Sequence, residues 1–363
     1  MQARSTPGLV TVFGGSGFVG RYTVRALAKD GWRIRVALRR PHLVPELRVM
    51  GDVGQIELYQ ANVRMKDSVA DALRGADAAV NLVGALYESG RQSFQALHVD
   101  AARDIAEAAA TEGVRRLVQM SAIGADPASD AIYARTKAEG EAAVRAAIPL
   151  STILRPSVIF GEEDQFFNRF AAMAGLSPAL PLIGGGKTLM QPVYVADVGA
   201  AVAAALASED ALGRTFELGG PGVYSFKALM EMMLAEIGRR RALVPLPFNI
   251  AEGIGGASEM LTIIGMAPPL TKDQVRMLRT DNVVGPGVNT LAGLGVAATA
   301  LEAVLPTYLW KYRSGGQFAQ PEGGNAGKSR TGTKGDERFG SPDPGPAAQA
   351  HITQPSGPSS STG

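Results

Sequence analysis

The sequence of 363 residues contains no cysteine. This absence excludes disulfides, thiolate nucleophiles and cysteine-ligated iron–sulfur clusters. Histidine is scarce: His42, His98 and His351 lie far apart and lack metal-ligand spacing, so we interpret each as a surface or packing residue and predict no metal site. The formal charge of +2 is close to balance and gives no indication of nucleic acid as a partner.

Long apolar runs are also missing. No stretch reaches the roughly eighteen continuous apolar residues that a membrane-spanning helix requires. The first apolar strand begins at Leu9, which leaves no room for a signal peptide before it. We therefore expect a soluble or peripheral protein of the cytoplasm, or a processed chain in an equivalent compartment.

The clearest local pattern is the stretch TVFGGSGFVGRYTVRALAKDG, residues 11–31. An apolar strand, Leu9–Phe13, leads through a glycine-rich turn into a helix whose apolar positions recur at helical spacing. The turn contains Gly15-x-Gly17-x-x-Gly20, the spacing of a dinucleotide-binding fingerprint, in which glycine lets a pyrophosphate approach the backbone and the helix N-terminus attracts phosphate. We predict a bound dinucleotide here; a purely structural turn is the alternative.

Two arginines indicate which dinucleotide is bound. The second predicted strand, Ile34–Leu38, ends in Arg39 and Arg40. An acidic residue at this distance from the fingerprint would bind the ribose hydroxyl of NAD, whereas arginine can pair with the additional phosphate of NADP. The sequence therefore favours NADP(H), with two solvated loop arginines as the alternative.

Strand and helix patterns alternate after the turn. Further predicted strands are Gln55–Gln60, Ala78–Val83, Arg116–Ser121 and Ser151–Leu154. Predicted helices between them are Lys66–Arg74, Phe94–Glu112 and Asp130–Ala147. This order predicts an α/β fold, a Rossmann-type doubly wound parallel sheet, whose ligands bind at the carboxyl ends of the strands. The residues expected at those ends are Asn62, Asn81–Gly84 including Val83, Ser121, Pro156 and Ser157.

The pattern changes twice further along the chain. We predict an NADP-binding Rossmann domain over 1–160, with later segments completing its sheet, and a smaller mixed α/β lobe over 161–314 with short strands such as Thr215–Leu218. Residues 315–363 contain eleven glycines and six prolines but no Leu, Val or Met. Such a tail cannot bury enough apolar surface to offset its ordering entropy, so we predict disorder, and an inert tail rather than one that wraps a partner.

Tyr133 and Lys137 are spaced for chemistry. They lie four residues apart in a predicted helix, so both side chains project from one face. A lysine beside a phenol lowers the pKa of the phenol and can hold a ribose hydroxyl, and Ser121 at the preceding strand end could bind a substrate oxygen. With a nicotinamide, these are the parts needed for carbonyl reduction or alcohol oxidation.

The stretch ALVPLPFNIAEGIGGASEMLTIIGMAPPL, residues 242–270, has only two charges, Glu252 and Glu259. If Asn249–Ile264 is helical, one apolar stripe forms from Ile250, Ile254, Ala257, Leu261 and Ile264. We favour packing of this stripe on the protein's own second lobe. Docking to a membrane subunit or to the lipid interface is the alternative, although the acidic polar face argues against anionic lipid. In either case the loops Pro245–Phe248 and Met266–Leu270 are the favoured contacts.

The turn together with YARTK, residues 133–137, resembles the extended and atypical short-chain dehydrogenases/reductases. The stretches ILRPSVIFGEEDQFFNRFA, PVYVADV, LTKDQVRMLRTDNVV and LEAVLPTYLWKYR are more specific. They are similar to the family of nucleotide-binding accessory subunits of respiratory complex I, the NADH:ubiquinone oxidoreductase, in a bacterial form. The resemblance covers roughly residues 8–313.

This resemblance implies a cofactor-binding role at particular positions. NADPH would be lined by the whole turn, namely Gly14, Gly15, Ser16, Gly17, Phe18, Val19 and Gly20, with the pyrophosphate at Gly14, Gly17 and Gly20. Arg39 and Arg40 would meet the adenosine phosphate, and Asn62 would lie near the adenine. Tyr133 and Lys137 would contact the nicotinamide ribose, with Val83, Ser121, Pro156 and Ser157 completing the site.

The resemblance also implies a structural function. Such a subunit holds NADPH tightly without turnover and stabilises the junction of the peripheral and membrane arms near the quinone site, where its partners are other complex I subunits. It would lie peripherally on the cytoplasmic side of the bacterial inner membrane. Because only eleven residues separate Ser121 from Tyr133, we name Ser121, Tyr133 and Lys137 as catalytic candidates only. The alternatives are a free-standing NADP-dependent oxidoreductase of a small carbonyl or quinone, and a sensor of the NADP(H) ratio.

Overall fold

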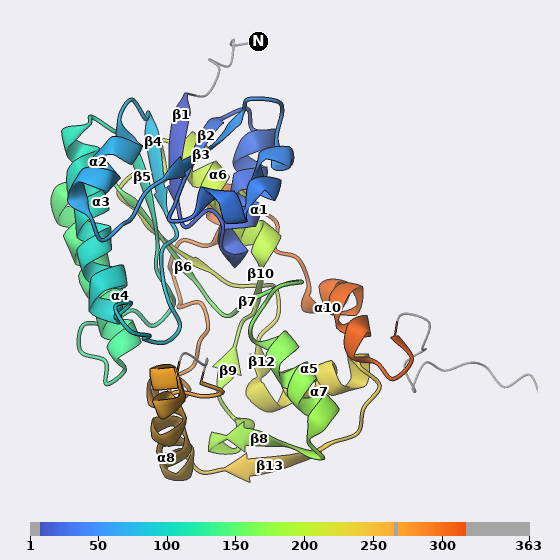
Figure 1. The fold of residues 1–363 in the computed structure, drawn as a ribbon. Coiled ribbons are helices and arrows are strands. Elements are labelled where there is room, and N and C mark those ends of the chain that lie inside the picture. Colours follow the sequence, from blue (N-terminus) through green and yellow to red (C-terminus); the bar gives the residue numbers. More distant parts are fainter. Residues whose placement is uncertain (1–7, 265–267, 317–363) are drawn as a thin grey trace, which may run out of the picture. The chain divides into compact units, whose positions relative to one another are not determined.

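The computed structural model of the protein describes residues 8–264 and 268–316. Its main feature is a seven-stranded sheet in the order β11-β6-β5-β4-β1-β2-β3, in which every neighbouring pair is parallel (Figure 1). The strands are β1 Leu9–Phe13, β2 Arg33–Leu38, β3 Ile56–Gln60, β4 Ala78–Asn81, β5 Arg116–Met120, β6 Thr152–Pro156 and β11 Thr215–Leu218. The direction of the strand order reverses between β1 and β4, which is where such sheets bind ligands.

Helices cover both faces of this sheet (Figure 1). One face carries α1 Phe18–Lys29 and α6 Val195–Ala207; the other carries α2 Lys66–Leu73, α3 Ala101–Thr111 and α4 Ile132–Ala147. Successive strand residues alternate between the two layers: Val12 packs in the α1–α6 core, and the next residue, Phe13, packs in the α2–α3–α4 core. Burial of both faces explains why the central strands β1 and β4 are largely apolar.

The predicted fold class is confirmed, and the predicted element bounds are close to those found. The strand predicted as Ala78–Val83 ends at Asn81, and the helix predicted as Asp130–Ala147 begins at Ile132. The helix predicted as Phe94–Glu112 starts differently: η3, Gln95–Asp100, is π-helical, and α3 follows it directly. π-helical turns are rare and frequently lie at functional sites.

The chain after β6 builds a second hydrophobic core. Its helices are α5 Phe167–Leu176, α7 Phe226–Glu236 and α10 Leu301–Leu309. Three two-stranded sheets accompany them: β7 Ile159–Phe160 with β10 Val193–Tyr194, β9 Leu189–Met190 with β12 Tyr224–Ser225, and β8 Ala179–Ile183 with β13 Ala242–Leu246. Short 3-10 helices are η1 Pro41–Leu43, η2 Pro45–Met50, η4 Gly184–Gly186, η6 Leu291–Leu294 and η7 Trp310–Tyr312.

The strand predicted in the smaller lobe, Thr215–Leu218, is β11 and lies in the main sheet beside β6 instead. Phe216 and Leu218 are buried in the α1–α6 core, and this apolar face is the physical reason. The predicted tail lies, apart from residues 315 and 316, outside the described residues.

The predicted helix over Asn249–Ile264 is present as α8 Phe248–Glu259 and η5 Met260–Ile264, followed by α9 Lys272–Met277. Our expectation that its apolar stripe packs in the core is wrong. Ile250 is 51% exposed and Ile254 is 48% exposed, whereas the buried residues of α8 are Ala251 and Gly255. The helix packs on α9 through its small residues. The approach is so close that a side chain at Gly255 would lie within 2.7 Å of the backbone nitrogen of Lys272 in α9.

Of the two loops expected as contacts, Pro245–Phe248 joins β13 to α8: Pro245 and Pro247 are exposed, whereas Leu246 and Phe248 are partly buried against Ala251 and Val275. In the other loop, Met266 and Ala267 lie outside the described residues.

Candidate functional site

The glycine-rich turn between β1 and α1 depends on two close backbone approaches. Gly14 adopts φ +79°, a left-handed conformation that favours glycine, and a side chain there would lie 3.0 Å from the carbonyl carbon of Leu82 after β4. A side chain on Gly20 would lie 2.3 Å from the carbonyl oxygen of Gly14. Gly17, by contrast, is exposed and meets only that same carbonyl oxygen, at 3.4 Å. The turn therefore packs tightly on its inner side and leaves its outer backbone accessible.

The N-terminus of α1 at this turn has no cap. Gly17 is the N-cap residue, no side chain accepts a hydrogen bond from the first turn, and no acidic residue lies within it. The first amide groups of a helix carry partial positive charge and need acceptors. An anionic ligand would provide them, which is the arrangement that the sequence predicts for a pyrophosphate.

Arg39 and Arg40 follow β2 directly, beside β1 in the sheet. Both are exposed, and within the described residues neither guanidinium has a hydrogen bond or an ion pair. Asn62 follows β3, the next strand, where its side-chain oxygen accepts from the backbone nitrogen of Arg64 at 3.2 Å. This side of the crevice thus offers two free cations and an asparagine amide group.

On the other side of the switch point, Lys137 of α4 is buried. Its Nζ donates to the carbonyl oxygen of Met120 at 3.3 Å, and it lies 5.7 Å from the ring centroid of Tyr133. Burial lowers the pKa of Lys137 to about 8, an effect that nearby Glu141 partly opposes. A side chain on Gly84, after β4, would lie 3.3 Å from this Nζ, so glycine there leaves space beside the buried ammonium group.

Tyr133 does not have the lowered pKa that we expected from Lys137. Removal from solvent and, to a smaller extent, the carboxylate of Asp273 together raise the pKa of Tyr133 to about 12. The lysine Nζ lies near the ring, and it is not among the groups that shift this phenol. The phenol therefore stays protonated at neutral pH and is a weaker acid than a free tyrosine.

Ser121, at the end of β5, holds an unsatisfied group. Its side chain is 3% exposed, and its Oγ has no hydrogen-bond partner within the described residues. Buried hydroxyl groups are almost always paired, so an unpaired one indicates a place for a ligand or water. It follows Met120, whose carbonyl binds Lys137, and so the structure brings two of the three catalytic candidates to one strand end.

Ser157 is engaged by the protein itself. Its Oγ lies 2.6 Å from the side-chain oxygen of Asn282 and 2.9 Å from the Asn282 carbonyl oxygen. Pro156, just before it, ends β6, and Val83 after β4 donates its backbone nitrogen to Asn81 Oδ1 at 3.0 Å. These predicted site residues line strand ends, but the Ser157 hydroxyl and the Val83 amide group have protein partners.

His98 is a buried packing residue of the π-helical segment η3, within the interpretation made from sequence, but its hydrogen bonds beside the site were missed. Its Nε2 accepts from the backbone nitrogen of Ala85 at 3.3 Å, so Nδ1 carries the proton toward Thr136 Oγ1, 3.0 Å away. The ring stacks on Phe94 and lies edge-on to Tyr133. Burial, and then Lys137, lower the pKa of His98 to about 2. A neutral imidazole therefore fixes the start of α4 against the loop after β4.

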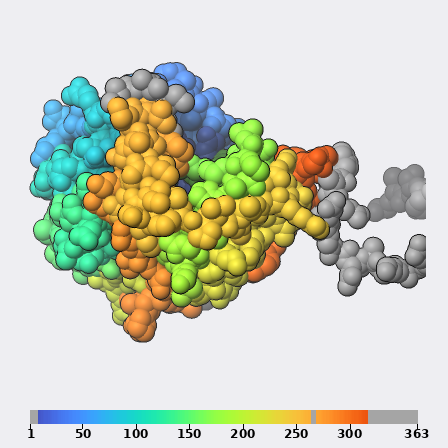
Figure 2. All heavy atoms as spheres, turned by 90° about the horizontal axis from the view of Figure 1, so that it is seen from below, coloured from blue at the N-terminus to red at the C-terminus, as the bar shows by residue number. Residues whose placement is uncertain are grey.

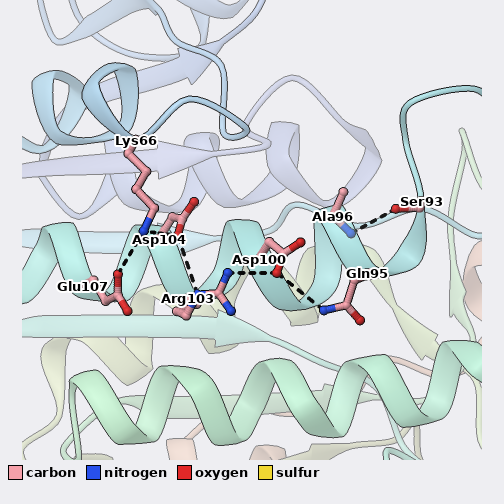
Figure 3. Close-up of polar contacts among 8 residues, drawn as sticks. All are labelled: Lys66, Ser93, Gln95, Ala96, Asp100, Arg103, Asp104 and Glu107. Atoms are coloured by element: carbon pink, nitrogen blue, oxygen red, sulfur yellow. Dashed lines mark hydrogen bonds and ion pairs between the residues drawn. The ribbon is translucent and has the colours of Figure 1, made fainter.

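The outer side of η3 and α3 is held by charged and polar contacts (Figure 3). Lys66 reaches from α2 to Asp104 at 3.2 Å and to Glu107 at 3.5 Å, and Arg103 pairs with Asp100 at 2.9 Å. Ser93 Oγ accepts from the backbone nitrogen of Ala96 at 3.1 Å where η3 begins. These contacts hold the segment that carries His98 from the side opposite α4.

Asp273 of α9 was also missed, and it caps the helix that carries Tyr133. Its two oxygens accept from the backbone nitrogens of Ile132 at 2.6 Å and Tyr133 at 2.9 Å. Gln274 donates to the carbonyl oxygen of Leu86 at 3.3 Å, so α9 bridges α4 and the loop after β4. The sequence did contain a local signal for α9, since Thr271 and Gln274 form a capping box.

Comparison with known proteins agrees with this fold. A profile described as the NAD dependent epimerase/dehydratase family matches residues 10–219. The chain belongs to this family. Among solved structures, the NADPH-dependent quinone oxidoreductase of Escherichia coli in complex with NADPH has a TM-score of 0.65 at 19% identity, and covers 82% of this chain and 99% of that one. A Citrobacter triphenylmethane reductase complexed with NADP(H) has a TM-score of 0.65 at 18% identity, covering 82% and 99%.

Curated relatives are more similar in sequence. The chain is 36% identical over 323 residues to mitochondrial NADH dehydrogenase (ubiquinone) 1 alpha subcomplex subunit 9 of Arabidopsis thaliana, covering 86% of this chain and 80% of that one. It is 32% identical over 311 residues to the mitochondrial NADH-ubiquinone oxidoreductase 40 kDa subunit of Neurospora crassa, covering 86% and 81%. A ceramide reductase of Caulobacter vibrioides is 33% identical over 203 residues, covering 56% and 62%.

Two further properties of the described residues concern the predictions above. None of their helices is long and apolar enough to cross a membrane. They also contain no group of three or more His, Asp or Glu side chains arranged to hold a metal ion.

Proposed function

We propose that the chain is an accessory subunit of respiratory complex I, of bacterial type, that binds NADPH tightly without turning it over. The observation that carries this proposal is similarity along most of the chain to subunits of NADH:ubiquinone oxidoreductase from a plant and a fungus. In the assembly it would stabilise the junction of the peripheral and membrane arms near the quinone site. Other complex I subunits would be its partners there, on the cytoplasmic face of the inner membrane.

Three features of the turn and crevice support NADPH as the ligand. The pyrophosphate would lie against Gly14, Gly17 and Gly20, where the uncapped start of α1 supplies amide donors. Arg39 and Arg40, both exposed and free among the described residues, would pair with the additional phosphate of the adenosine. Asn62 would lie near the adenine.

The other end of the ligand would meet the group around Lys137. The Lys137 ammonium group and the unpaired hydroxyl of Ser121 would hydrogen-bond to the ribose and the carboxamide of the nicotinamide nucleoside. Tyr133 would contact the same ribose, and Pro156 and Ser157 would pass beside the nicotinamide. When bound, the nicotinamide supplies a transferable hydride; the residues of this chain bind and orient it.

The lack of turnover is supported by Tyr133. Proton transfer in carbonyl reduction is efficient when the pKa of the donor lies near the working pH. The phenol of Tyr133 has a pKa of about 12, and Asp273 from α9 contributes to this rise. A site with this proton donor would reduce a carbonyl slowly.

A second candidate function is a free-standing NADP-dependent oxidoreductase of a small carbonyl or quinone. The observation in its favour is 33% identity over 203 residues to a ceramide reductase, together with the presence of Ser121, Tyr133 and Lys137. In that case, NADPH oxidation over many turnovers should disappear in Tyr133→Phe while nucleotide binding survives.

The deciding experiment is mild detergent solubilisation of native membranes, capture through a tag on this chain, and mass spectrometry of both the proteins and the acid-released nucleotide. Recovery of complex I subunits with near-stoichiometric NADPH supports the structural role. Recovery of the chain alone from the soluble fraction overturns it and directs the search to quinones and aldehydes as substrates. Partners that change with the NADPH to NADP ratio, without turnover, would indicate a sensor.

A further inference from the structure

One end of the protein exposes apolar side chains from two adjacent elements. Figure 2 shows the yellow-to-orange segment that contains β13 and α8 across the face turned to the viewer. Val244 of β13 is 49% exposed, and beyond α8 Met260 is 67% exposed. Together with the exposed Ile250, Ile254 and Ala257 of α8, we call these residues the β13–α8 face. Adjacent apolar exposure of this kind marks a contact surface.

The acidic side chains around this face are all engaged. Glu252 pairs with Arg279 at 2.7 Å, and Glu259 accepts from the backbone nitrogen of Lys272 at 2.8 Å. The remaining acidic residues between 226 and 279 are Glu231, paired with Lys227, Glu236, paired with Arg313, and Asp273, which caps α4. The two glutamates of α8 therefore no longer argue against an anionic partner.

Not every positive charge near this face is engaged in the same way. Three arginines, Arg239, Arg240 and Arg241, immediately precede β13, and they line a groove with the Lys227–Glu231 pair and the apolar Leu234 and Leu243. Arg239 and Arg241 donate to the carbonyl oxygens of Tyr312 and Ala174. Arg240 is exposed, and its guanidinium has no partner among the described residues. Lys272, at the start of α9, is also exposed. The charge left over beside the apolar face is thus positive.

The composition of residues 317–363 does not suit them to cover the β13–α8 face. Residues 317–363 contain no Leu, Val or Met, and their charges of both signs are balanced. A stretch of this composition gains little by covering isoleucine and valine side chains. The occupant must combine an apolar layer with negative charge.

We propose that the β13–α8 face binds the surface of an anionic lipid bilayer. The apolar side chains enter the boundary between headgroups and acyl chains, and Arg240, with Lys272, pairs with lipid phosphates. This inference goes beyond the proposed function, because the face attracts anionic lipid whether or not the chain assembles with complex I.

The test uses the full chain with nucleotide, and vesicles of phosphatidylglycerol and phosphatidylcholine in equal amounts, in a sedimentation assay at low salt. Arg240→Glu should lower the partition coefficient about tenfold, and the double variant Ile250→Ser/Ile254→Ser should lower it by a similar factor. Added salt should weaken the wild-type binding, and pure phosphatidylcholine vesicles should bind little.

Matched controls lie at the opposite end of the main sheet. Arg115→Glu and Leu150→Ser change an exposed arginine and a 58% exposed leucine there, and should bind vesicles like the wild type. Equal loss in Arg115→Glu and Arg240→Glu, or no wild-type binding at low salt, overturns the proposal. The proposal is also overturned if the protein forms a dimer without lipid and Ile254→Ser dissociates it, because a second copy of the chain then covers the face. The nucleotide and partner recovery described above tests the complex I assignment separately, so either can fail alone.

Discussion

Two helix N-termini in this protein solve the same problem in opposite ways. Neither α1 nor α4 has a side-chain cap of its own, since Gly17 and Ala131 precede them. At α4 the carboxylate of Asp273 accepts from the first two amide groups, although it lies far along the chain. At α1 no side chain does so. The first amide groups of both helices need acceptors, and of these two helices the described residues supply a side-chain acceptor only to α4.

The difference separates a fixed part of the site from a part kept for a ligand. Asp273 holds the start of α4, and with it Tyr133, to the C-terminal half of the chain. The open start of α1 lies beside two arginines without partners among the described residues. If this comparison is right, changes near α1 should act on nucleotide affinity, and changes near α4 should act on stability and ionisation.

The largest effect is expected from Gly20→Ala at the start of α1. The new side chain would meet the Gly14 carbonyl oxygen at 2.3 Å, so the turn must shift. We expect NADPH affinity to fall about a thousandfold, about 4 kcal/mol, measured by titration calorimetry and by the nucleotide retained on purification. Gly175→Ala, in α5 with no atoms within 4 Å of the new side chain, is the control and should retain its nucleotide. Full NADPH retention by Gly20→Ala would contradict a phosphate site at this turn.

Lys137 gives the second effect, on stability against pH. Its pKa is lowered from 10.5 to about 8, so between these values the unfolded chain binds more protons than the folded one, and the free energy of unfolding rises with pH. In nucleotide-free protein, Lys137→Met should remove this rise and increase the free energy of unfolding at pH 7 by up to about 3 kcal/mol. Urea unfolding from pH 7 to 11 measures it. An unchanged slope in the variant would show that another group is responsible.

The third effect sharpens the role of the arginines beside α1. Replacing both Arg39 and Arg40 by Ala should reduce the preference for NADPH over NADH about thirtyfold, about 2 kcal/mol, because a charged hydrogen-bonded pair with the phosphate is lost. Arg33→Ala, exposed at the opposite end of β2, should leave the preference unchanged. Affinities for both nucleotides, measured at one ionic strength, provide the comparison.

The smallest effect concerns the cap of α4. Asp273→Ala should lower the free energy of unfolding by about 1 to 2 kcal/mol, as loss of an N-cap does. Ser225→Ala, which removes a local cap of α7, should cost a similar amount and serves as the reference. Only Asp273→Ala should also lower the pKa of Tyr133, because its charge contributes to the rise. Phenolate absorbance during alkaline titration separates the two variants.

Periodicity predicted the nucleotide-binding half well because its contacts are local or repeat along the chain. Leu9–Phe13 is a continuous apolar strand, and its bounds were correct. The prediction that the apolar stripe of α8 is buried was wrong for a physical reason. Hydrophobicity marks a face of the helix, but Gly255 and Ala251 allow closer packing than isoleucine does. The hydrogen bonds of His98 and Asp273 were missed because their partners, Thr136 and Ile132, become neighbours only when the chain is folded.

The position of β11 has a consequence for synthesis. Translation completes β6 at Pro156, yet the strand that pairs with its open edge, Thr215–Leu218, is made only after β7 to β10 and α6. Until then a growing chain displays an unpaired, buried-type strand edge, the feature through which nascent chains associate wrongly. The main sheet can therefore be complete only after Leu218 has emerged from the ribosome. A chaperone that shields β6 during that interval would raise the yield of folded protein.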